Sequence, residues 1–146
     1  MVASTDPVES RGVLPLIQLI ADLIAKRCDR FLNNRYGLTM PQYLVLLAAR
    51  NGRDVTLGGL SDELHCSRGN VTGIVDRLER DEWLKRERSK DDRRVIWVRL
   101  TEKGNRVTEI ERELVRELAT LSKVWTHLQQ GQMTEMLLLM YKELQD

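Results

Sequence analysis

The sequence has few of the residues that end helices or make tight turns. It holds nine glycines and three prolines in 146 residues, and aromatic side chains make up 5% of the chain. Low glycine and proline content disfavours a turn-rich β-sandwich and favours helices. Hydrophobic residues, at 42%, supply enough apolar material for a core, which argues against a wholly disordered chain. The length predicts one domain.

The sequence also has few cysteines, no long apolar run and almost no excess of one charge. Two cysteines, Cys28 and Cys66, are too few for a disulfide framework and favour a reduced, cytoplasmic protein. No run approaches about 18 consecutive apolar residues, so we expect no membrane helix. The first twelve residues do not resemble a secretory signal. With 23 basic and 22 acidic residues, any binding to nucleic acid must depend on local charge.

Apolar periodicity predicts helices over most of the chain. Residues 13–34 carry an apolar stripe at helical spacing, and Gly37 is expected to end that helix. Thr39 and Gln42 have the spacing of a capping box for the next helix, which Asn51-Gly52 should end. Further helices are expected at 57–64, from Ser67 to about 82, from Thr101 to about 125 and at 132–144, with a break at Gly131.

The middle of the chain combines a closely spaced helix pair with two strands. The helices at 57–64 and 67–82 are separated by about three residues, which is helix-turn-helix spacing. Residues 83–88 and 95–100 are expected to form strands, because Ile96, Val98 and Leu100 alternate with their neighbours. Residues 89–94 would then be the polar tip of a hairpin.

The start of the second helix of this pair carries side chains that suit DNA bases. In a helix-turn-helix unit this end meets base edges in the major groove. The candidates with short or forked hydrogen-bonding groups are Ser67, Arg68, Asn70 and Thr72. Gly69 and Gly73 would let the backbone approach DNA closely. The apolar residues Val71, Ile74, Val75 and Leu78 mark the opposite side, which should face the core.

The hairpin beside this helix is basic. Residues 85–94 contain six basic and three acidic side chains, so this cationic loop has the character of a wing that phosphates attract. An arginine at its tip can enter a narrow minor groove. Lys90, Arg93 and Arg94 are the candidates at the tip, and an acid, Asp91 or Asp92, can pair with an arginine and fix its direction.

These segments resemble the MarR family of winged-helix transcription regulators. The motifs that carry the resemblance are the run from Ser67 to Glu79, Trp83-Leu84, Asp92-Arg93-Arg94 and Leu100-Thr101-Glu102-Lys103-Gly104, with Leu38–Tyr43 resembling the family's second helix. The resemblance covers roughly residues 13–145. It implies a mainly α fold in a single domain over 1–146. A winged helix-turn-helix DNA-binding lobe with a small β-hairpin wing, at 38–100, would be flanked by dimerisation helices at 13–36 and 102–145.

The resemblance also implies a function. It implies a homodimeric, ligand-responsive repressor that binds a pseudo-palindromic operator. By matching motif positions, Arg94 would be the minor-groove arginine, Asp92 its orienting acid, Arg77 a phosphate contact and Asp76 a partner in a supporting ion pair. Gly73 stands where some members carry a larger polar residue. The family's usual effector pocket, for a phenolic or carboxylate compound, would involve Arg27, Arg30, Phe31, Tyr36 and Tyr43.

Two other functions remain open. Acids beside the second helix, with the near-zero net charge, fit a dimeric protein-interaction module; these acids are Asp76, Glu79, Asp81 and Glu82. Cys28 on the apolar stripe, or Cys66 near a helix N-terminus, could make a thiol redox-responsive regulator. Beside His65-Cys66 the only other histidine is His127 and there is no third cysteine, so no metal or other cofactor is expected. No phosphate-binding glycine loop or nucleophile motif indicates an enzyme.

Overall fold

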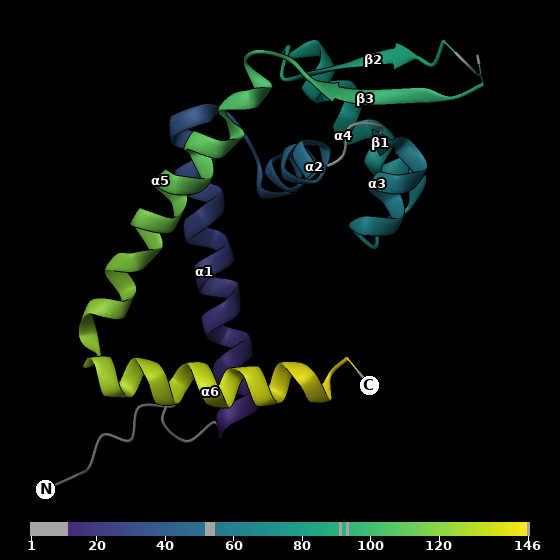
Figure 1. The fold of residues 1–146 in the computed structure, drawn as a ribbon. Coiled ribbons are helices and arrows are strands. Elements are labelled where there is room, and N and C mark those ends of the chain that lie inside the picture. The colour runs from purple at the N-terminus through teal and green to yellow at the C-terminus, as the bar shows by residue number, and fades with distance from the viewer. Residues whose placement is uncertain (1–11, 52–54, 91, 93, 146) are drawn as a thin grey trace, which may run out of the picture. The chain divides into compact units, whose positions relative to one another are not determined.

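The computed structural model describes residues 12–51, 55–90, 92 and 94–145, and is mostly helical with one small sheet (Figure 1). The elements in chain order are α1 (Val13–Tyr36), α2 (Met40–Asn51), β1 (Val55–Thr56), α3 (Leu57–Glu63), α4 (Arg68–Arg80), β2 (Leu84–Arg88), β3 (Ile96–Leu100), η1 (Gly104–Arg106), α5 (Val107–Ala119), η2 (Thr120–Val124) and α6 (His127–Glu143). The chain forms two compact units, one up to Glu111 and one from Arg112 onward. None of the described helices has the length and apolarity that crossing a membrane requires.

The first unit contains the core, which is built around the segment from α2 to β3, called the winged lobe below. The apolar face predicted for α4 is confirmed, because Val71, Ile74, Val75 and Leu78 are all buried. They pack in a unit whose other fully buried side chains include Leu32, Leu38, Val45, Leu46, Leu60, Leu84 and Val98. A capping box begins α2, as predicted, since the backbone N–H of Thr39 donates to Gln42 Oε1 at 2.8 Å.

The sheet is antiparallel, with the strand order β1-β3-β2. The predicted hairpin is confirmed, and its register pairs Leu84 with Leu100 and Arg88 with Ile96. Strand β1 was not predicted; it pairs Val55 with Val98. Two residues are too few to show an alternating pattern, so only the partner strand reveals them.

The end of β3 is tied to the corner between α4 and β2. The hydroxyl of Thr101 donates to Glu82 O at 2.6 Å and accepts from the Gly104 N–H at 3.1 Å. A Cβ at Gly104 would lie 2.0 Å from Trp83 O, so only glycine fits against this corner. Lys103 closes the contact by donating to Asp81 O at 2.8 Å. The Thr101–Gly104 motif therefore fixes where the hairpin ends and where the next helix begins.

The second unit corrects two sequence predictions. Helix α5 ends at Ala119 and continues into the 3-10 turn η2, so the prediction of one helix to about residue 125 is wrong. Helix α6 begins at His127 and contains Gly131, so the predicted break at Gly131 is also wrong. Thr126 and Gln129 form a capping box at its start. A glycine inside a helix lowers helix stability by about 1 kcal/mol relative to alanine. A capping interaction stabilises the helix by a similar amount and offsets this loss.

Candidate nucleic-acid interface

The first turns of α4 are organised by two hydroxyl groups. Ser67 Oγ accepts a hydrogen bond from the Asn70 backbone N–H at 3.3 Å and caps the helix. The Thr72 hydroxyl donates to Arg68 O at 2.7 Å. Its hydrogen is therefore committed inside the helix, which leaves the methyl group and the oxygen lone pairs of Thr72 for a partner. These contacts keep the predicted residues of α4 in a regular helix.

Three polar side chains of α4 stand exposed with their donors available. Arg68, Asn70 and Arg77 are exposed, and no described residue makes a hydrogen bond or ion pair with their side chains. Gly69 and Gly73 leave the helix surface open between them, because an added Cβ at either would meet nothing within 4 Å. The surface of α4 opposite the core can thus approach a groove and donate hydrogen bonds there.

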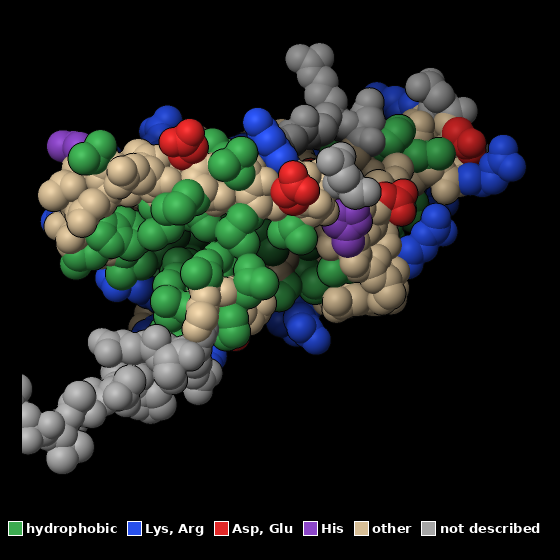
Figure 2. Space-filling view, turned by 90° about the horizontal axis from the view of Figure 1, so that it is seen from below, with side chains coloured by type: hydrophobic (Ala, Val, Ile, Leu, Met, Phe, Trp, Pro, Cys, Tyr) green, Lys and Arg blue, Asp and Glu red, His purple; other side chains and the backbone are tan. Residues whose placement is uncertain are grey.

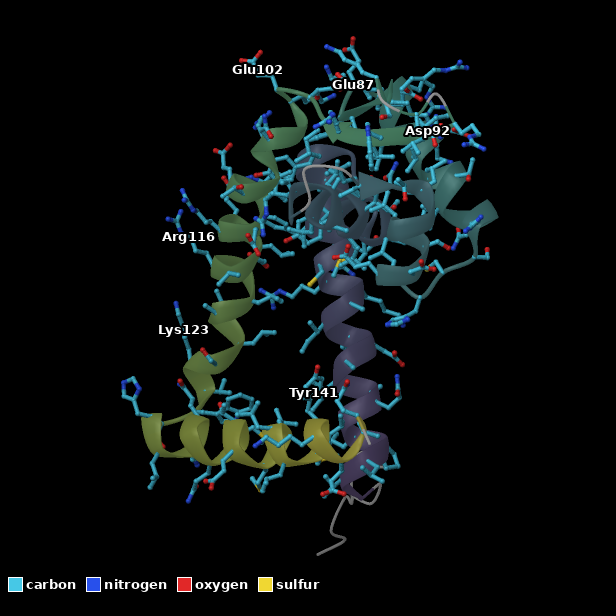
Figure 3. The ribbon with its side chains drawn as sticks, turned by 45° about the vertical axis from the view of Figure 1, so that its right-hand side comes forward. Glu87, Asp92, Glu102, Arg116, Lys123 and Tyr141 are labelled. Atoms are coloured by element: carbon cyan, nitrogen blue, oxygen red, sulfur yellow. The ribbon has the colours of Figure 1, made fainter. Side chains whose placement is uncertain are left out.

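At the tip of the hairpin, Asp92 holds Arg94 outward. Asp92 Oδ1 accepts hydrogen bonds from the Arg94 backbone N–H at 2.9 Å and from its Nε at 3.3 Å. The side chain of Arg94 is 92% exposed, and Asp92 lies toward the end of the hairpin (Figure 3). Lys90 is exposed nearby. Arg93, a predicted DNA contact, and Asp91 lie outside the described residues.

Arg86 does not join the exposed cations of the hairpin, although it was counted among them in the sequence. Its guanidinium donates to Asp76 at 2.6 Å and to Glu79 at 2.5 Å, and its side chain is only 22% exposed. Burial lowers the pKa of Arg86, but the hydrogen bonds to the two carboxylates outweigh it and raise the pKa. Arg86 is thus the ion-pair partner that the resemblance implied for Asp76. The sequence signal for this ion pair is the spacing of Asp76 and Glu79, which places both acids on the same side of α4.

A second ion-pair group neutralises further charge on the hairpin. Lys85 Nζ lies 2.6 Å from Glu87 Oε1, and Arg99 Nε lies 2.8 Å from Glu87 Oε2. The hydrogen bond from Lys85, together with the charges of both cations, lowers the pKa of Glu87. Glu87 lies in β2, whereas Asp92 lies in the loop beyond that strand, and Figure 3 labels both residues. The positive charge that the hairpin offers to a partner is therefore concentrated at its tip.

The predicted effector residues lie on α1 and α2. The rings of Phe31 and Tyr36 are 6.3 Å apart, so the structure brings these two together. Tyr43 is 4% exposed, and burial, aided by the charge of Glu111, raises its pKa. Arg27 is half-buried and Arg30 is exposed.

The two cysteines occupy different environments. Cys28 is buried on α1, whereas Cys66 is half-buried and its thiol donates to Leu64 O at 3.2 Å. The described residues contain no group of three or more His, Cys, Asp or Glu side chains that could hold a metal ion.

Residues 38–96 match the family model described as the MarR family. The chain is 34% identical over 73 residues to the uncharacterised HTH-type transcriptional regulator YfiV of Bacillus subtilis, covering 50% of this chain and 46% of that protein. It is 31% identical over 86 residues to the HTH-type transcriptional regulator MgrA of Staphylococcus aureus, covering 56% of this chain and 58% of MgrA. The chain thus spans about half the length of these relatives.

The fold is similar to solved structures over nearly the whole chain. A MarR family protein from Bacillus stearothermophilus superposes with a TM-score of 0.76 at 28% identity, covering 90% of this chain and 92% of that one. CouR from Rhodococcus jostii RHA1, bound to p-coumaroyl-CoA, superposes with a TM-score of 0.68 at 21% identity, covering 84% and 86%. The mainly α, winged-helix fold predicted from the sequence is confirmed.

Proposed function

The chain belongs to the MarR family of transcription regulators, and from that premise we propose that it regulates transcription by binding double-stranded DNA at a specific sequence. The observation that carries this proposal is the outward-held Arg94 at the tip of a hairpin beside α4. In this proposal α4 enters the major groove with Arg68 and Asn70 at base edges, while Arg94 enters the minor groove. Arg77, Lys90 and Arg93 would contact phosphates, and Ser67 and Thr72 would complete the surface on α4.

The second part of the proposal is a homodimer. Several large apolar side chains in α6 and at its C-terminal end are more than half exposed, among them Leu128 at 72% and Leu144 at 80%. The first turns of α1 also expose apolar side chains, including Val13 and Leu14, and hydrophobic surface is extensive in Figure 2. A second copy of the chain would remove this surface from water. A twofold dimer would bind a pseudo-palindromic operator with half-sites about one helical turn apart.

The third part is control by a small molecule. The effector proposed here is a phenolic or carboxylate compound that binds near Arg27, Arg30, Phe31, Tyr36 and Tyr43 and releases a repressor from its operator. Support comes from the aromatic and cationic side chains on α1 and from CouR, a structural neighbour bound to p-coumaroyl-CoA. Such an effector acts only if it binds the DNA-free shape of the dimer more tightly than the DNA-bound shape.

The test begins with the purified protein and a random duplex library at low salt. Selection is expected to enrich a pseudo-palindromic sequence, and Arg94→Ala should weaken binding to it by about tenfold or more. The slope of log affinity against log salt should fall by about 0.9 if Arg94 neutralises one phosphate charge. Lys26→Ala, which removes a charge from the exposed side of α1, is the control and should leave affinity within about twofold.

Asn70→Ala separates base contact from phosphate contact. We expect it to relax sequence preference while leaving the salt slope unchanged, because an amide neutralises no phosphate. If the wild-type protein retards no duplex at low salt, the proposed function is wrong. If it binds and Arg94→Ala binds equally well, the assignment of the hairpin as a wing is wrong.

A further inference from the structure

Arg86 joins the hairpin to α4 through three hydrogen bonds from one residue. Its Nη2 donates to Asp76 Oδ1, its Nη1 donates to Glu79 Oε2, and its backbone N–H donates to Glu79 Oε1 at 3.0 Å. Asp76 and Glu79 are three residues apart, so they lie on the same side of α4. Strand β2 is an edge strand, and the N–H that Glu79 accepts faces away from β3.

This arrangement restrains the angle between α4 and β2 as well as their distance. A guanidinium is planar and its donors have fixed directions, so a fork between two carboxylates holds one relative orientation. Glu79 adds a second restraint because its two oxygens bind the side chain and the backbone of the same residue. The β2–β3 ladder then carries this orientation from Arg86 to the strand ends next to the tip.

The same contacts make a direct role for Arg86 on DNA a poor fit. Both terminal nitrogens of its guanidinium already donate to carboxylates, and the side chain is mostly buried against α4. Among the described residues, Arg94 in contrast is held by Asp92 on its own loop, and its side chain extends into solvent. The two arginines of the hairpin therefore have different tasks, although the sequence presents both as wing cations.

We propose that Arg86 is the positioning residue that holds the hairpin and α4 as one unit, so that the contribution of Arg94 to DNA binding depends on Arg86. This inference rests on the proposed function. Arg86 would then be a determinant of specific binding that does not itself touch the DNA. Loss of the fork would let the hairpin move relative to α4, and Arg94 would no longer meet the minor groove when α4 is in the major groove.

The experiment is a double-mutant cycle on the duplex that the wild-type protein selects. Arg86→Lys keeps the charge but cannot span both carboxylates, so we expect it to weaken binding by about tenfold, as Arg86→Gln does. In the Arg86→Lys background, Arg94→Ala should cost much less than its tenfold effect in the wild type. If Arg86 instead contacted a phosphate, Arg86→Lys would retain most of the affinity and the two losses would multiply, which would overturn the proposal.

A matched control lies one residue away. Lys85 is in the same strand but pairs with Glu87 rather than with α4, so Lys85→Gln removes an equal charge without loosening the fork. It should leave affinity within about twofold, because an exposed pair contributes little. An equal loss in Lys85→Gln and Arg86→Gln would mean that the net charge of the hairpin is what counts, and the positioning role would fail.

Folding and function are separated by two further measurements. Thermal unfolding of each variant shows whether the lobe is intact, and Glu79→Gln weakens the fork from the other side if Arg86 variants do not fold. Glu79→Gln should reproduce the reduced effect of Arg94→Ala, and a full tenfold effect in that background would refute the proposal. Failure of the wild-type protein to bind any duplex would overturn the proposed function itself, whereas additive losses in a protein that binds would overturn only the role of Arg86.

Discussion

Many leucine and valine side chains are fully buried in the winged lobe, whereas the leucines of α6 are exposed. Leu60, Leu78 and Val98 have no exposed surface, whereas Leu138 and Leu139 in α6 are more than half exposed. In the lobe, the buried apolar residues of α4 fall on one face, and most of the consecutive apolar residues at 43–49 in α2 are buried as well. In α6, Leu137, Leu138 and Leu139 are consecutive, so they cover more than one face of the helix.

The difference shows which part of the chain can be stable by its own contacts. The lobe satisfies its apolar faces internally and ties its elements together by specific polar contacts, such as those of Thr101 and Arg86. In addition to α6, the second unit contains only the end of α5 and η2. We therefore expect changes in the lobe to alter folding, and changes in α6 to alter association.

A matched pair of leucines tests this expectation with the largest effect. Leu78→Ala removes a fully buried side chain from α4 and should lower the free energy of unfolding by about 2–5 kcal/mol. Leu139→Ala removes an exposed side chain from α6 and should instead weaken the proposed dimer. Urea unfolding measures the first effect, and analytical ultracentrifugation over a range of protein concentrations measures the second.

The contrast between the winged lobe and α6 would be contradicted if Leu78→Ala and Leu139→Ala exchanged their effects. A large loss of stability in Leu139→Ala, independent of protein concentration, would show that α6 packs within its own chain. An unchanged dimer in Leu139→Ala together with an unchanged stability would show that α6 has no apolar partner at all.

Two glycines give a second matched pair. Gly104→Ala would place a methyl group 2.0 Å from Trp83 O, which is backbone and cannot rotate away, so we expect a loss of about 1–3 kcal/mol. Gly131→Ala in α6 would meet nothing within 4 Å and improves helix propensity, so stability should change by less than about 1 kcal/mol. Thermal unfolding of both variants checks this, and equal destabilisation would contradict the contrast.

Features that depend on local interactions could be predicted from the sequence. The apolar stripe and Gly37 gave both ends of α1 within a few residues, since Gly37 adopts a left-handed conformation at the helix end. The spacing of Thr39 and Gln42 gave the start of α2. Asp92 beside Arg94 was expected as a local pair, and the geometry agrees, while its role in DNA binding stays a prediction.

Features that depend on distant partners could not be predicted in the same way. Strand β1 exists only because β3 pairs with it, and the sequence shows Arg86 only as one of the basic residues of the hairpin because its partners lie on another element. The start of α6 was missed for a different reason. Thr126 and Gln129 have the same capping pattern as Thr39 and Gln42, but the prediction rested on Gly131 as a break and did not use this cap.

The two capping boxes provide a smaller test of the same contrast. Thr39→Ala and Thr126→Ala each remove a cap whose loss costs about 1 kcal/mol. In α2 the buried face should keep the first turn in place, whereas most apolar side chains of α6 are exposed. Hydrogen exchange should therefore speed up at the first turn of α6 in Thr126→Ala, and change little in α2 in Thr39→Ala. Equal exchange in both would mean that α6 is packed as firmly as α2.

The smallest expected effect is a fall in the free energy of unfolding at alkaline pH, which we expect to come from Tyr43 in the lobe. Burial, with the charges of Glu111 and Cys28, raises the pKa of Tyr43, and Arg50 opposes this only in part. The folded state therefore favours the neutral phenol. Its contribution is fully present below about pH 10, where the unfolded tyrosine titrates, and is lost as the pH rises through the folded pKa. Tyr43→Phe should make urea stability fall less steeply above about pH 10. Tyr141→Phe in α6, where the ring is exposed, controls for loss of a phenol, and an equal change in both variants would remove Tyr43 as the cause.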